Sequence, residues 1–232
     1  MKKIIAAILV LMTVISAVSC KNGKDNGTDT TDSGVVVGEW TVNTEFGEAP
    51  IPEDVKSAFD NALKAYEGGE EFVPVAYLGS QVVAGFNYVY LCTSSKDDGT
   101  SALNIVTVYK GFSGESFITE ISEANIEPEK NGKTVFGPGD LSTGKYNFAD
   151  TTGAGLSGDA AAAFSKVADN LGGLIYTPVA LLGTQSAAGV NYAVLCKAES
   201  VSAESKFALA VVYLGVDTAG NASVITVREF VV

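Results

Sequence analysis

The chain contains no histidine among its 232 residues. Histidine is the usual general base at neutral pH and the commonest metal ligand, and serine or cysteine catalytic triads of the usual kind depend on it. Triads of that kind are therefore excluded. The carboxylates follow no catalytic motif, and nothing in the sequence has the spacing of a metal-binding cluster. We therefore expect a protein that is not an enzyme, with no catalytic residue, no metal and no cofactor.

Cysteine is scarce, with only Cys20, Cys92 and Cys196 present. Cys92 and Cys196 occupy equivalent places in two copies of a repeated pattern, described below, so neither copy can form a disulfide of its own. Free cysteine is among the most frequently buried residue types. We expect both to be buried free thiols.

Only one long apolar run is present, Ile4 to Ile15, and it follows Lys2 and Lys3. Even when counted on to Val18, the apolar stretch is about 15 residues long and falls short of the roughly 20 that a membrane-spanning helix needs. The charged start, the apolar run and the small residues before Cys20 predict a signal peptide over residues 1–19. The segment resembles a bacterial lipoprotein signal, which implies that Cys20 is acylated and anchors the protein at a membrane surface of the bacterial cell envelope.

Large apolar side chains are absent from residues 21–34, which cannot bury a core. Together with the lipidated Cys20, we expect residues 20–34 to form a flexible tether. Loss of Lys2 and Lys3 with the leader would lower the 15 basic residues to 13, against 27 acidic residues, for a formal charge of −14. A chain this acidic is not expected to bind nucleic acid.

The remaining sequence contains two copies of one pattern. Residues 81–88 read QVVAGFNY, and residues 185–192 read QSAAGVNY. Flanking residues recur at the same offset of 104, namely Pro74, Leu78, Gly79, Cys92 and Tyr109, matched by Pro178, Leu182, Gly183, Cys196 and Tyr213. This offset is too long for a solenoid repeat and fits one small domain. We expect one domain over residues 35–125 and a second over residues 126–232.

Each copy contains one amphipathic helix. In the first copy an apolar stripe begins after Pro52 and runs to a Gly68-Gly69 stop; its members are Val55, Ala58, Phe59, Ala62, Leu63 and Tyr66. In the second copy Ser157 is the candidate N-cap, and an equivalent stripe runs to Gly172-Gly173. The spacing predicts a helix of about four turns in the first copy and the same helix in the second.

Strand-forming runs surround both helices. A short strand is expected before each helix, at Gly38–Val42 and at Gly144–Phe148. Further strands are expected over residues 73–83, 86–95, 102–110 and 116–122 of the first copy, and over 177–187, 190–197, 206–214 and 223–231 of the second. The order β-α-β-β-β-β predicts an α+β fold with two tandem domains, each an antiparallel sheet wrapped on one helix.

The stretch from Phe72 to Cys92 is too long for one ordinary strand. A hairpin turn near Gly85 would place Val82, Val83 and Ala84 at an exposed tip, where apolar residues are unfavourable unless a partner covers them. Alternatively, Gly85 marks a bulge in one long bent strand whose valines belong to the core. The residues alone leave both interpretations open.

The motif from Gln81 to Tyr88 resembles the Q-x-V-x-G hairpin of cystatins and stefins, and the order of elements is similar to theirs. The resemblance covers both copies and hence most of the mature chain. It implies a reversible, tight-binding inhibitor of papain-like cysteine proteases. In that family an N-terminal glycine segment, the Q-x-V-x-G loop and a second hairpin with Pro-Trp together fill the protease cleft.

Carried over by position, the resemblance implies a protease-binding surface made of the N-terminal glycine, the first hairpin and the second hairpin, with these residues: Gly38, Gln81, Val82, Val83, Ala84, Gly85 and Phe112. The second hairpin, Gly111 to Glu115, lacks Pro-Trp, and Phe112 is the candidate substitute for the missing aromatic. In the second copy the loop keeps Gln185 and Gly189 but has Ala187 instead of valine. The first copy is the better inhibitor candidate. The alternative is a non-inhibitory cell-surface protein-binding module on a cystatin-like scaffold.

Overall fold

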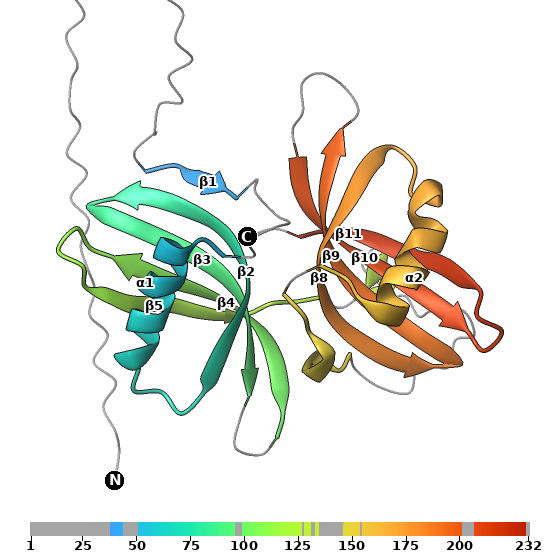
Figure 1. Ribbon diagram of the computed structural model, residues 1–232, viewed down its shortest axis with the longest axis horizontal. Helices are drawn as coiled ribbons and strands as arrows, with labels where there is room; N and C mark the ends of the chain where they lie inside the picture. The colour runs from blue at the N-terminus through green and yellow to red at the C-terminus, as the bar shows by residue number, and fades with distance from the viewer. Residues whose placement is uncertain are drawn as a thin grey trace, which may run out of the picture. The chain divides into compact units, whose positions relative to one another are not determined.

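The computed structural model describes residues 38–43, 51–95, 99–126, 128–130, 133–134, 146–153, 155–200 and 207–230. It shows an α+β fold with two antiparallel sheets, one of five strands and one of four, each packed against one helix (Figure 1). This confirms the predicted fold class. Both repeats fall within one compact unit, Val35–Val232. The predicted signal peptide, tether and lipidated Cys20 lie outside the described residues.

Repeat one is a five-stranded sheet in sequential order with α1 across one face. Its strands are β1 (Trp40–Val42), β2 (Glu71–Val83), β3 (Gly85–Ser95), β4 (Ser101–Lys110) and β5 (Ser116–Glu123), and α1 spans Glu53–Lys64. All neighbouring strands pair antiparallel. The predicted strands are confirmed to within two residues at each end.

Repeat two has the same helix and four strands. They are α2 (Gly158–Val167), β8 (Leu174–Ala187), β9 (Gly189–Ser200), β10 (Phe207–Asp217) and β11 (Ala222–Phe230). The strand expected at Gly144–Phe148 is wrong for its described part: Asn147 makes one isolated bridge to Thr184, and Phe148–Asp150 is a short 3₁₀ helix, η1. A two-strand ribbon, β6 (Glu129–Lys130) and β7 (Lys133–Thr134), lies between the repeats in sequence.

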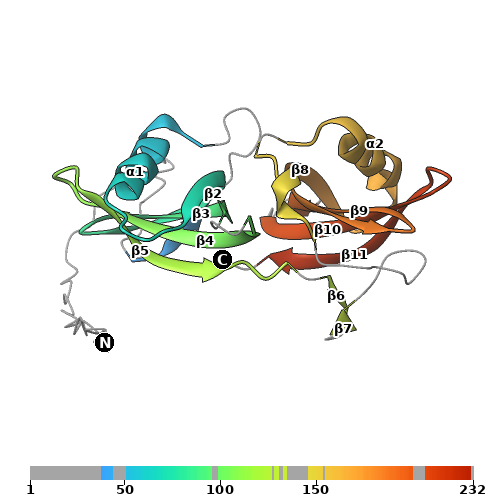
Figure 2. The same cartoon turned by 90° about the horizontal axis from the view of Figure 1, so that it is seen from below.

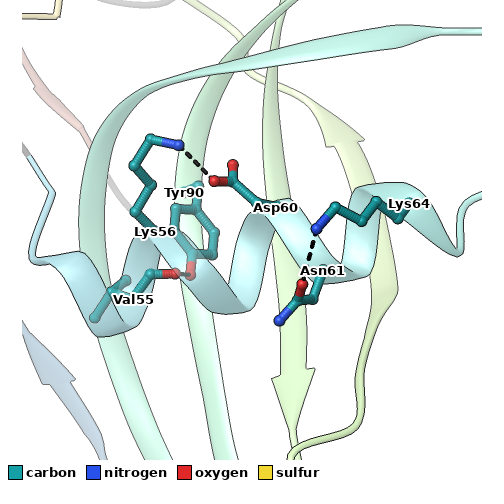
Figure 3. Close-up of polar contacts among 6 residues, drawn as sticks. All are labelled: Val55, Lys56, Asp60, Asn61, Lys64 and Tyr90. Carbon is teal, nitrogen blue, oxygen red and sulfur yellow. Dashed lines mark hydrogen bonds and ion pairs between the residues drawn. The ribbon is translucent and has the colours of Figure 1, made fainter.

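Helix α1 begins directly after Pro52, whose extended backbone serves as the N-cap. It ends at Lys64, so the predicted stripe is helical except for Tyr66, which packs against the same core from outside the helix. Tyr90 of β3 donates a hydrogen bond from its hydroxyl to the Val55 carbonyl, which ties the helix to the sheet (Figure 3). The ring of Tyr90 is fully buried and lies 4.9 Å from that of Phe59.

Helix α2 carries a weaker version of the same stripe. Ser157 is at the N-cap position as predicted, although its side chain makes no capping hydrogen bond. The helix ends at Val167 and is followed by a 3₁₀ turn, η2 (Ala168–Asn170), so Leu171 packs on the core from beyond the helix. Figure 2 shows each helix on one face of its own sheet.

Side chains alternate between the two faces of each sheet, as strand geometry requires. In repeat one, Tyr88, Tyr90 and Cys92 pack toward α1, whereas Val89 and Leu91 belong to a cluster on the helix-free face. That second cluster also contains residues from the helix-free face of the other sheet, among them Leu195 and Tyr213. The helix-free faces therefore contribute to one common hydrophobic core.

Cys92 and Cys196 are fully buried free thiols, as predicted. Burial raises the pKa of both thiols well above the ordinary value, because ionisation would place a charge in an apolar interior. Within the described ranges, no helix is both long and apolar enough to cross a membrane.

Candidate functional site

A tight hairpin joins β2 to β3. Val83 pairs with Gly85 across the turn, and Ala84 is the exposed tip residue. Gly85 has a φ of +144°, and a Cβ there would lie 2.4 Å from the Lys110 carbonyl oxygen, so glycine is required on two grounds. The interpretation as one long bent strand is wrong. Val82 and Val83 are half-buried, so they are neither fully exposed, as a tip would make them, nor part of the core, as a bent strand would make them.

The residues expected at the binding surface come together at this end of the sheet. The Gly38 amide donates to the Val82 carbonyl at 2.9 Å, and Gln81 Nε2 donates back to the Gly38 carbonyl at 3.0 Å. Phe112, in the loop between β4 and β5, places its ring 5.9 Å from that of Phe86, just beyond the tip. The N-terminal segment, the first hairpin and the second hairpin are thus adjacent. We call this set, Gly38, Gln81–Gly85 and Phe112, the hairpin end of repeat one.

Two hydrogen bonds hold the first hairpin in shape. Tyr109 donates from its hydroxyl to the Ala84 carbonyl at 2.6 Å, which supports the tip directly. Asn87 Nδ2 donates to Gln81 Oε1 at 2.9 Å, across the ladder. Bonds of this kind fix a loop before it meets a partner.

The glutamine–asparagine bond recurs in repeat two. Asn191 Nδ2 donates to Gln185 Oε1 at 2.8 Å, and both side chains are buried. Gly189 has a φ of +124°, and a Cβ there would lie 1.9 Å from the Val216 carbonyl oxygen. In both copies, therefore, the Gln, Asn and Gly of the motif stabilise the hairpin itself.

Aromatic side chains distinguish the two hairpin ends. Strand register and equal loop lengths match four aromatic residues at this end of repeat one with positions in repeat two, and each of the four is replaced there by a small or aliphatic residue. The pairs are Phe86 with Val190, Tyr109 with Gly215, Phe112 with Thr218, and Phe117 with Ser223. Phe112 is 75% exposed and Phe117 is 47% exposed.

This register also corrects one pairing from the sequence. Tyr109 lies opposite Asn87, but Tyr213 lies opposite Ala193, which corresponds to Val89. The structural equivalent of Tyr213 is therefore Thr107, because the connection between β9 and β10 is two residues longer than the one between β3 and β4. Sequence reasoning consequently missed Tyr109, along with Phe86 and Phe117, as aromatic neighbours of the hairpin end.

The second hairpin of repeat two is a closed polar turn. The Asp217 carboxylate accepts hydrogen bonds from the backbone amides of Ala219 and Asn221 and from the Asn221 side chain. These bonds favour the charged form and lower the pKa of Asp217. Ala187 is half-buried, Ala188 is exposed at the tip and Val190 is 38% exposed, so this end of repeat two presents aliphatic rather than aromatic surface.

No group of three or more His, Cys, Asp or Glu side chains suited to a metal ion occurs among the described residues. The chain matches no protein-family model, and no curated protein matches it.

Proposed function

We propose that repeat one is a reversible inhibitor of papain-like cysteine proteases, which inserts the Gln81–Gly85 hairpin and Phe112 into the protease cleft. The observation that carries this proposal is the contrast between the two hairpin ends. Repeat one gathers Gly38, an apolar tip and aromatic side chains at one end of a sheet. Repeat two keeps the hairpin but has none of the aromatics.

The geometry suits insertion without chemistry. Ala84 and Phe112 are exposed, and exposed apolar groups on a protruding loop gain stability when a partner covers them. Hydrogen bonds from Tyr109 and Gln81 already fix the tip and the N-terminal segment. Little conformational entropy is lost on binding, which favours tight association.

A second candidate function is a non-inhibitory protein-binding module. It is favoured by the structural use of the motif, since Gln81 and Asn87 bond each other and the same bond occurs in repeat two. On this interpretation the motif serves folding, and the partner of the hairpin end is another class of protein.

A matched pair of variants separates these functions. Ala84 and Ala188 are the exposed tip residues of the two hairpins, so Ala84→Glu and Ala188→Glu add the same charge at equivalent places. Residues 35–232 and both variants would be titrated against papain. We expect stoichiometric inhibition that is lost in Ala84→Glu and kept in Ala188→Glu. No inhibition at micromolar concentration, or equal loss in both variants, would contradict the proposal.

We also propose that acylated Cys20 anchors the chain to a bacterial membrane. The support is the leader pattern before Cys20. Cys20→Ser is expected to move the full-length protein from the membrane fraction to the soluble fraction. A variant that stays in the membrane fraction would contradict the anchor.

A further inference from the structure

Repeat one has a hollow on the helix-free face of its sheet, beside β1. Its volume is about 320 Å³, at the lower end of the range for small-molecule sites. The floor is apolar, formed by Leu78, Val89 and Ile105. Trp40 and Val42 line it from β1, and both are exposed to nearly half of their surface.

The hollow follows one row of paired residues across the sheet. Val42 pairs with Gly79, Gly79 with Val89, Val89 with Thr107, and Thr107 with Glu120. Directly paired residues project from the same face, so this row crosses all five strands. Gly79 adds no side chain, and a Cβ there would lie 2.6 Å from the Thr41 carbonyl oxygen. The backbone of β1 therefore packs directly on Gly79, and the row has no side chain at that position.

One aromatic ring occupies the same row in repeat two. Gly183 pairs with Ala193, and Ala193 pairs with Tyr213, which stands where repeat one has Thr107. Tyr213 is fully buried and donates its hydroxyl to the Ile126 carbonyl.

The residue that matches Trp40 in repeat two is also turned inward. Asn147 bridges to Thr184, and Thr184 is the residue of repeat two that matches Ser80, the partner of Thr41. Asn147 therefore matches Thr41, and Tyr146 matches Trp40. Tyr146 is only 5% exposed, whereas Trp40 is 46% exposed. The rings of Tyr146 and Tyr213 are 5.9 Å apart. One scaffold thus fills this place with phenol rings in one copy and leaves it open in the other.

We propose that the hollow of repeat one binds a small aromatic molecule that carries a protonated amino group. The ligand ring takes the place that Tyr213 occupies in repeat two, against Val89 and Ile105 and beside the indole of Trp40. The amino group lies at the rim, where Glu120 supplies a carboxylate and Thr107 and Ser122 supply hydroxyl acceptors.

Charge favours a cation over an anion at this place. Glu120 is the charged residue of the hollow's described lining, and the chain has a formal charge of −12. The lining of the hollow shares no residue with the hairpin end, although Trp40 pairs with Gln81, and the inference does not rest on protease inhibition.

The test uses Trp40, the only tryptophan of the chain, as a built-in reporter. Phenethylamine would be titrated into residues 35–232 while tryptophan fluorescence is recorded. Phenylacetate, which has the same ring and the opposite charge, is the matched ligand control. We expect a saturable change with phenethylamine and much weaker binding of phenylacetate.

Two variants complete the experiment. Thr107→Tyr copies repeat two and fills the hollow, so it should abolish binding. Glu120→Gln changes an exposed side chain without threatening the fold, and it should weaken phenethylamine binding about threefold, the size expected for an exposed ion pair. If Thr107→Tyr fails to fold, Glu120→Gln and the phenylacetate control decide. No saturable change, equal affinity for both ligands, or unchanged binding in either folded variant would overturn the proposal.

Discussion

Phe112 gives a sharp test of the proposed protease contact, because most of its surface is still available to a partner. The residue is 75% exposed, and full burial of a phenylalanine is worth up to about 3 kcal/mol. The exposed three quarters can therefore contribute about 2 kcal/mol when a protease covers them. Since about 1.4 kcal/mol corresponds to a tenfold change in affinity, Phe112→Ala is expected to raise the inhibition constant against papain about 30-fold.

The same substitution should leave the fold intact. The edge contact between the rings of Phe112 and Phe86 is worth about 1 kcal/mol, and its loss lowers Tm by about 2 to 4 °C. Thr218→Ala changes the equivalent position of repeat two and should alter neither inhibition nor Tm. A folded Phe112→Ala protein that inhibits as well as the unmodified chain would refute the proposed contact.

Three further substitutions or conditions follow from the geometry. Tyr109→Phe removes the bond to the Ala84 carbonyl, worth about 1 kcal/mol, and should raise the inhibition constant several-fold in the papain titration; unchanged inhibition would contradict tip support. Gly85→Ala should lower Tm by calorimetry, because of its positive φ and the nearby Lys110 carbonyl; an unchanged Tm would contradict this backbone account. Burial raises the pKa of the Cys92 and Cys196 thiols, so the stability of the protein should depend on pH. The contribution of the thiols to stability is complete below the unfolded-state pKa of about 8.5. Above that pH it falls by about 1.4 kcal/mol per pH unit for each thiol. Urea unfolding on either side of that pH checks this, and a Cys92→Ala/Cys196→Ala variant with an equally steep decline would contradict it.

Much of the fold was predictable because its signals are local. The apolar stripe of α1 and the alternating residues of β3 each specify one element and one buried face. The hairpin turn was harder, since Gly85 suits both a turn and a bulge. Only the pairing of Val83 with Gly85 decides between them.

Other features depended on contacts that sequence patterns do not record. The residues around Tyr146 alternate like those of a strand. In the structure, however, the ring of Tyr146 packs against that of Tyr213, and Asn147 makes an isolated bridge rather than part of a strand ladder. The two-residue shift that separates Tyr109 from Tyr213 was invisible because a slip of two keeps every side chain on the same face. For the same reason, neither the aromatic hairpin end nor the hollow beside Trp40 was foreseen in full.

The stoichiometry of the complex with papain tests the central claim most directly. Isothermal titration calorimetry of residues 35–232 with papain would count the proteases bound by each chain. The contrast between the two hairpin ends predicts one protease per chain, bound at repeat one. Two proteases per chain would show that the aromatic residues do not define the site, and no binding heat across several temperatures would contradict protease inhibition itself.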